Sequence, residues 1–86
     1  MAINRAVEVA EAVRRALGGR EELQVCSQVE ALALISLIVL QAGCMDLGTR
    51  TTMSTAAECE FGDHGMRAEI SLVDRHGHVR GSIGIK

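Results

Sequence analysis

The chain has 86 residues, of which 48% are hydrophobic, only Phe61 is aromatic, and the formal net charge is −2. This length fits one domain, residues 1–86, near the lower limit at which a single hydrophobic core suffices. The weakly acidic balance and the shortage of aromatic side chains exclude the basic and base-stacking surfaces that bind nucleic acids, so we expect no direct nucleic-acid binding.

The cysteines and the N-terminal segment indicate where the protein works. Cys26, Cys44 and Cys59 are odd in number and irregular in spacing, which predicts reduced, buried thiols rather than a disulfide framework. The first residues mix arginine with glutamate and lack the apolar segment of a signal peptide. The most apolar stretch, residues 31–40, is shorter than the roughly 20 residues that span a bilayer. We therefore expect a cytoplasmic protein without a membrane segment.

Residues 3–17 predict an amphipathic helix, because apolar side chains recur there every three or four positions. The predicted apolar face consists of Ile3, Val7, Ala10, Val13 and Leu17. Gly18 and Gly19 then end the helix. This face packs against the core or, alternatively, binds a partner.

A second helix is predicted over residues 21–42, with Glu21 and Glu22 in its first turn and Gly43 as its stop. The short glycine connection predicts an antiparallel helical hairpin. Residues 31–40 are apolar all round, which predicts burial on several sides of the helix. The expected contact with a second copy, in a homodimer, is formed by Leu34, Leu37 and Ile38.

After Gly48 the hydrophobic period changes from 3.6 to 2, which predicts strands over about residues 50–61, 66–74 and 78–85. The apolar residues have odd numbers in the first and third segments and even numbers in the middle one. Each hairpin loop must therefore contain an even number of residues, or a bulge must restore the alternation. The first hairpin is predicted to pair Phe61 with Met66, Glu60 with Arg67, and Glu58 with Glu69. Gly81 and Gly84 predict a bulge or a close backbone approach in the last strand, whose free edge alternatively accepts a partner strand.

These elements predict an α+β fold in two layers. A helical hairpin packs on a three-stranded antiparallel β-meander, in the order ααβββ.

The residues that could carry chemistry do not converge in this fold. His64 lies in one turn and His76 and His78 in the other, about 25–30 Å apart along the strand between them. Two histidines supply only half of the ligands of a structural zinc site. Cys59 and His64 lack a third group that would orient a nucleophile. We therefore predict no catalytic residue, no metal and no cofactor.

The polar sheet face and the hairpin turns are the predicted binding surface for a protein partner, through charge complementarity. Its candidate residues are Arg50, Glu58, Glu60, Asp63, His64, Arg67, Glu69, Arg75, His76 and Arg80. The alternative is that this face is ordinary solvated surface.

Residues 36–42, Ser-Leu-Ile-Val-Leu-Gln-Ala, resemble a helical segment of a small phage-encoded anti-CRISPR protein, a type I-E inhibitor. The all-helical fold of that family differs from the strands predicted here, and no functional residue carries over. The resemblance implies a small acidic phage protein that inhibits host machinery by binding to it in the bacterial cytoplasm.

The predicted function is a small non-enzymatic protein-binding module. Its most specific form is a phage or mobile-element inhibitor that occludes a surface of a bacterial host complex, such as a CRISPR surveillance complex. The alternative is a homo-oligomeric module that binds a small apolar ligand between the second helix and the sheet. That cavity would be lined by Met53, Met66, Leu34 and Ile38.

Overall fold

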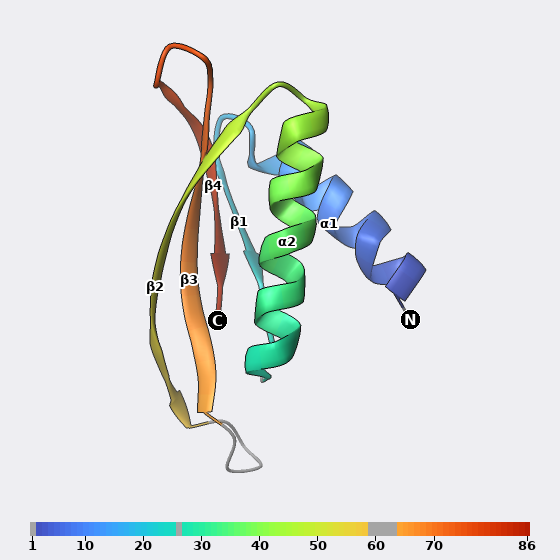
Figure 1. Cartoon of the computed structure of the whole chain (residues 1–86), viewed down its shortest axis with the longest axis vertical. Helices are drawn as coiled ribbons and strands as arrows, with labels where there is room; N and C mark the ends of the chain where they lie inside the picture. The colour runs from blue at the N-terminus through green and yellow to red at the C-terminus, as the bar shows by residue number, and fades with distance from the viewer. Residues whose placement is uncertain (1, 26, 59–63) are drawn as a thin grey trace.

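The computed structural model describes residues 2–25, 27–58 and 64–86. Two helices, α1 (Ala2–Ala16) and α2 (Gln28–Cys44), cover one face of a four-stranded sheet (Figure 1). The strands are β1 (Arg20–Leu23), β2 (Gly48–Glu58), β3 (His64–Val73) and β4 (Val79–Ile85), and their spatial order is β1-β4-β3-β2. The predicted α+β class is confirmed, and β2, β3 and β4 begin and end within three residues of the predicted strands.

The strand β1 occupies residues that were predicted to begin the second helix. It pairs in parallel with β4, with Leu23 opposite Ile85, so the sheet is mixed and four-stranded. The predicted antiparallel meander is present as β2, β3 and β4, but the predicted sheet of three strands is wrong, because β1 adds a fourth, parallel strand. Side chains alternate along this segment as in a strand, since Leu23 and Val25 are buried and Gln24 is exposed. The predicted helical hairpin is also wrong, because β1 separates the two helices along the chain.

The helix α1 packs on the sheet through small and β-branched side chains. Its buried face consists of Val9, Ala12, Val13 and Ala16. This spacing of three and four residues is the helical period, but the face is rotated from the predicted one, and Val7 is 53% exposed. The helix ends where Gly18 takes a positive φ of 79° and the Gly19 N–H donates to the Ala16 carbonyl at 2.9 Å.

The helix α2 begins at Gln28 because Ser27 caps it. The Ser27 backbone is extended (φ −141°, ψ 129°), and its hydroxyl accepts a hydrogen bond from the Glu30 N–H at 3.3 Å. A serine followed three residues later by a glutamate is the capping-box pattern. Cys26, directly before it, lies outside the described residues.

The helix α2 ends at Cys44, two residues beyond residue 42, where the predicted helix ends. Asp46 adopts a positive φ of 58°. The Leu47 N–H donates to the Ala42 carbonyl at 2.8 Å, and the Asp46 N–H donates to the Gly43 carbonyl at 3.2 Å. These two bonds form a Schellman motif with Asp46 in the position that glycine usually takes. Cys44 is exposed rather than buried as predicted.

The core lies between the helices and the inner face of the sheet. Its buried strand residues are Ala68, Ile70, Leu72, Ile83 and Ile85, and α2 adds Ala31, Leu34, Ile38 and Ala42. The predicted alternation of the last two strands is therefore confirmed except beside the β3–β4 turn, where the register shifts after Leu72, Val73 is buried and Val79 is exposed. One of the two glycines in β4 is also explained, because a Cβ on Gly81 would overlap the carbonyl oxygen of Ala16 at the end of α1.

The pairing of β2 with β3 differs from the predicted register. Met66 lies opposite Thr55 rather than Phe61, a displacement of six residues, and Arg67 therefore lies opposite Ser54. An even displacement leaves the same positions on the same face, so the alternation survives. The register shifts between Thr55 and Glu58, where a bulge or irregularity interrupts the pairing. Phe61 and Glu60, the predicted partners of Met66 and Arg67, lie outside the described residues.

Candidate interaction site

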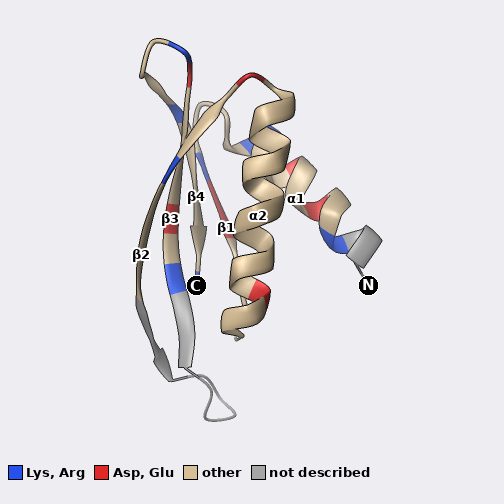
Figure 2. Cartoon of the chain, viewed as in Figure 1, with Lys and Arg blue, Asp and Glu red and all other residues tan. Residues whose placement is uncertain are grey.

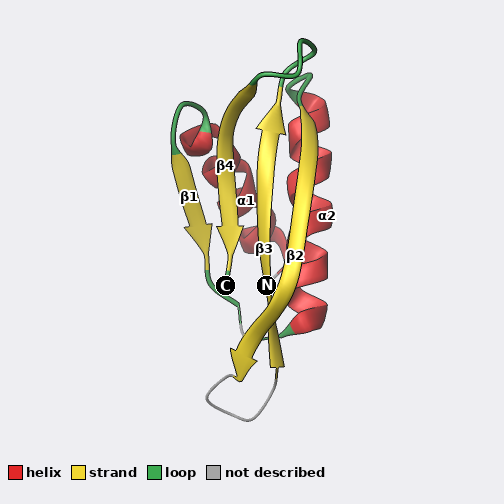
Figure 3. Ribbon diagram, turned by 90° about the vertical axis from the view of Figure 1, so that its left-hand side faces the viewer, coloured by secondary structure: helices red, strands yellow, loops and turns green. Residues whose placement is uncertain are grey.

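Figure 3 shows the outer sheet face, which the helices leave open. The strand registers place polar residues from all four strands on this face. In one row across the sheet, Thr52 lies opposite Glu69, Glu69 opposite Gly84, and Gly84 opposite Glu22. The predicted partner residues Arg50 and Glu69 are on this face, as is Arg67. The sheet therefore does bring part of the predicted set together.

An ion cluster occupies this face where β1 joins the sheet. The Arg20 guanidinium lies 2.8 Å from the Glu69 carboxylate and 3.3 Å from Glu22, and the Lys86 ammonium lies 3.1 Å from Glu22. The hydrogen bond from Lys86, and then the charges of Lys86 and Arg20, hold the pKa of Glu22 below its ordinary value. Three of these four residues are absent from the predicted partner set. Arg20 and Glu22 were missed because this segment was predicted to begin a helix, whereas Lys86 directly follows the predicted last strand.

A shallow hollow of about 310 Å³ opens beside this cluster. It is lined by Arg20, Thr52, Ser54, Arg67, Ala68, Glu69, Gly84, Ile85 and Lys86. The hollow lies on the outer sheet face rather than between α2 and the sheet, where the apolar-ligand alternative would need it. Its lining includes the Arg20–Glu69 ion pair and the charged side chains of Arg67 and Lys86, so the surface suits a polar macromolecule better than an apolar ligand.

The β3–β4 turn holds a second polar group at the far end of the sheet. The Asp74 carboxylate accepts hydrogen bonds from the His76 and His78 backbone N–H groups, both at 2.9 Å. These bonds, with His78 contributing most, lower the pKa of Asp74. The two imidazole rings lie 6.3 Å apart and are exposed. Within the described ranges, no three His, Cys, Asp or Glu side chains are grouped as metal ligands.

The predicted partner residues do not form one site. Arg67 and Arg75 are separated by eight residues along and beyond β3, about 26 Å at the rise of a strand. Arg75 and His76 therefore belong to the turn, and Arg80 lies beside it at the start of β4, 3.9 Å from the Asp74 carboxylate. Arg67 and Glu69 belong to the middle of the sheet. Glu60 and Asp63, together with the side chains of Glu58 and His64, lie outside the described part of the structure.

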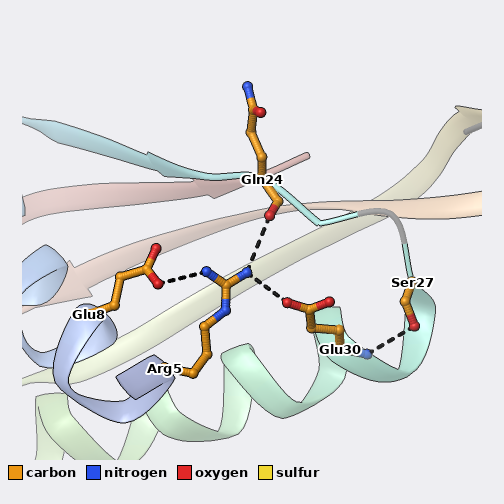
Figure 4. Close-up of polar contacts among 5 residues, drawn as sticks. All are labelled: Arg5, Glu8, Gln24, Ser27 and Glu30. Atoms are coloured by element: carbon orange, nitrogen blue, oxygen red, sulfur yellow. Dashed lines mark hydrogen bonds and ion pairs between the residues drawn. The ribbon is translucent and has the colours of Figure 1, made fainter. Parts of the chain in front are cut away.

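A junction of α1, α2 and the segment after β1 fixes the position of α2 (Figure 4). The Arg5 guanidinium donates to Glu8 at 2.8 Å, to Glu30 at 2.7 Å and to the Gln24 carbonyl at 3.3 Å. The hydrogen bonds to Glu8 and Glu30 raise the pKa of Arg5, although burial opposes them. Glu30 is the one charged residue of α2, and its charge is thus held at one end of the helix.

The side of α2 that faces away from the core is apolar and exposed. We call it the α2 apolar face; it consists of Val29, Leu32, Ala33, Ser36, Val39, Leu40 and Gly43. Val29 is 77% exposed, Leu40 69%, Leu32 47% and Val39 45%. Figure 2 shows that, among its described residues, α2 carries one charge, near its start. A contiguous apolar face of this kind marks an interaction site.

The strand β2 runs along this side of the molecule as an edge of the sheet. In the described sheet it pairs with β3 alone, so its other edge presents backbone groups without a strand partner. Met53 lies on the inner face of β2 and is nevertheless 56% exposed. The last strand, which was predicted to offer a free edge, lies between β1 and β3, so that prediction is wrong.

The predicted oligomer contact falls on the wrong side of α2. Leu34 and Ile38 are 1% and 0% exposed and belong to the core, and Leu37 is half-buried against it. The physical reason is the helical period: the sequence shows that α2 is apolar all round, but not which side α1 and the sheet cover. The contact surface that remains available is the α2 apolar face.

Comparisons with known proteins add no relative: no family model, no curated protein and no solved structure matches the chain. Among the described residues, no helix combines the length and the apolar character needed to cross a membrane.

Proposed function

We propose that this chain is a small non-enzymatic protein-binding module. The observation that supports the proposal is the α2 apolar face, which lies next to the free edge of β2. An aliphatic surface of this kind gains free energy when a partner covers it. A free strand edge additionally offers backbone hydrogen bonds to a partner strand.

The titratable groups of the outer sheet face and of the β3–β4 turn support binding rather than proton transfer. A carboxyl group that works as a general acid or base near neutral pH needs a raised pKa. The pKa values of Glu22 and Asp74 are instead lowered by the cations and N–H groups around them. Both carboxylates therefore stay ionised and paired, as in a surface that recognises a partner by charge.

The narrower proposal is an inhibitor, encoded by a phage or mobile element, of a bacterial host complex such as a CRISPR surveillance complex. The segment that resembles the type I-E inhibitor lies in α2, where Ser36, Val39 and Leu40 are exposed. Mixed charges on the outer sheet face would add specificity when the protein occludes a partner surface. The apolar-ligand alternative is less well supported, because Leu34 and Ile38 are packed inside the core.

The test measures both self-association and capture of other proteins by the purified chain. We expect binding by the wild type and by Val79→Glu, whose side chain is 58% exposed but lies outside the α2 apolar face. The double variant Val29→Glu/Leu40→Glu should lose it. If the folded wild type neither self-associates nor captures a protein, the proposal is wrong. The narrower proposal of an inhibitor is tested by measuring how well a purified type I-E surveillance complex binds its nucleic-acid target with and without this protein.

A further inference from the structure

We propose that the partner of the α2 apolar face is a second copy of this chain, related to the first by a two-fold axis. In this dimer α2 packs antiparallel to α2 of the second copy, and the two β2 strands pair to continue the sheet. The inference rests on the proposed function and names its partner.

The α2 apolar face is complementary to itself when the axis passes through Ser36. Each residue of one copy then lies opposite a residue of the second copy, and the two residue numbers add up to 72. The resulting pairs are Leu32 with Leu40, Val29 with Gly43, and Ala33 with Val39. Two of the three pairs place a large side chain against a small one, which is how helix surfaces interdigitate. Ser36, a small residue, sits at the crossing point, where the helices approach most closely.

Charge does not oppose this arrangement. The described residues of α2 include one charge, Glu30, and the Arg5 guanidinium holds it at 2.7 Å (Figures 2 and 4). The antiparallel arrangement places the two copies of Glu30 at opposite ends of the contact. No like charges therefore meet across the α2 apolar face.

The edge of β2 can share the same axis. Ser36 lies eight residues, about 12 Å, before the end of α2. Met53 lies five residues, about 16 Å, after the start of β2. Figure 1 shows that α2 runs toward the end of the molecule where β2 begins. The two midpoints therefore lie at similar distances, about 12 and 16 Å, from the neighbouring ends of the two elements.

The sequence of β2 also suits antiparallel pairing with itself. Residues 51–55 read Thr-Thr-Met-Ser-Thr, nearly the same in both directions. Pairing about Met53 therefore sets Thr52 opposite Ser54 of the second copy, and such hydroxyl pairs are favourable between strands. The two copies of Arg50 are kept six residues, about 20 Å, apart.

The α2 apolar face and Met53 supply part of the area that a dimer needs. The exposed parts of the four large side chains of the α2 apolar face, and of Met53, would together remove on the order of 500 Å² per copy from water. The β2 edge adds its backbone to this area. A stable interface typically buries about 800 Å² per partner. Self-association would also join the two outer sheet faces into one continuous polar surface.

Sedimentation equilibrium over a range of concentrations tests the dimer. We expect the wild type to approach 18.4 kDa, twice the chain mass of 9.2 kDa, and Leu40→Glu to remain at 9.2 kDa while keeping its circular dichroism spectrum. Val7→Glu is the matched control, because Val7 is an exposed apolar residue of α1, outside the proposed interface; it should still dimerise. A folded wild type that stays monomeric, or a Leu40→Glu variant that still dimerises, overturns the inference.

A cross-link tests the position of the axis. In a chain whose three native cysteines are replaced by serine, Ser36→Cys should form a covalent dimer on mild oxidation. Arg67→Cys, on the outer sheet face, should not; equal yields from the two variants would overturn the arrangement. A monomeric chain that instead binds another protein through the α2 apolar face would overturn this inference and leave the proposed function standing. A folded chain that neither dimerises nor binds another protein would refute both this inference and the proposed function.

Discussion

The missing side chain of Gly81 allows a helix and a strand to meet. A Cβ atom there would overlap the carbonyl oxygen of Ala16 and lie 3.2 Å from the amide nitrogen of Leu17. A glycine inside a strand pattern predicts a close backbone approach. Which backbone approaches could not be predicted, because only the tertiary fold brings residue 16 beside residue 81.

We expect Gly81→Ala to lower the free energy of unfolding by about 2 kcal/mol or more, since the added methyl group must displace the end of α1. Chemical denaturation followed by circular dichroism measures this change. Gly19→Ala is the matched control, because an added Cβ there meets no atom within 4 Å. That variant should change stability by less than about 0.5 kcal/mol. Equal effects in the two variants would contradict the explanation.

Asp74 links the stability of the β3–β4 turn to pH. The backbone N–H groups of His78 and His76 hold its pKa below the ordinary value of 3.8. A carboxyl whose pKa is lower in the folded state stabilises the fold above its unfolded pKa, and this contribution disappears as the pH falls through the folded pKa. We expect wild-type melting temperature to fall more steeply below about pH 4 than that of Asp74→Asn. Parallel melting curves for the two proteins would show that the turn does not depend on this charge.

At the scale of elements, the sequence reveals the strands with long alternation but not the shortest one. The inner positions of β3 and β4 follow from period 2 alone. In contrast, β1 has four residues, Arg-Glu-Glu-Leu, which are good helix formers on average, and its parallel pairing with β4 spans most of the chain. Two signals could have revealed it: the alternation of Leu23 and Val25, and the capping pattern of Ser27 and Glu30.

The candidate site was incomplete for the same reason. Glu69 was predicted on the polar face, but its cationic partner Arg20 lies directly before the predicted second helix, and Glu22 was placed in the first turn of that helix. The ion cluster depends on β1 pairing with β4, a long-range contact that local periodicity does not report. Lys86 joins the cluster only because the end of β4 reaches Glu22 across this pairing.

A substitution at Ser27 tests directly where α2 begins. We expect Ser27→Ala to lower the free energy of unfolding by about 1 kcal/mol, because the Glu30 N–H loses its hydrogen-bond acceptor. Ser27→Asp should retain most of the stability, since aspartate caps helices equally well. Both values come from denaturant titrations of the purified variants. An unaffected Ser27→Ala variant would show that the helix does not begin at this residue.

For the whole molecule, α2 is the element with two different sides. Its composition predicts burial all round, yet the described chain covers only the side that contains Ile38. A chain this short has two layers and cannot enclose a helix completely. The uncovered side is therefore a consequence of size, and it is also the surface on which the proposed function depends.

Two substitutions separated by a single residue distinguish these sides. We expect Ile38→Glu to abolish folding, because it buries an unpaired carboxylate in an aliphatic core, at a cost above about 4 kcal/mol. The total stability of a small domain is only about 5–15 kcal/mol. Leu40→Glu, at a position that is 69% exposed, should keep the helical and strand signals in circular dichroism and unfold cooperatively.

If Ile38→Glu melts like the wild type, α2 does not form the core. If Leu40→Glu also unfolds, the α2 apolar face is part of the monomer's stability rather than a binding surface. Only the contrast between the two variants supports a helix that organises the fold with one side and binds a partner with the other.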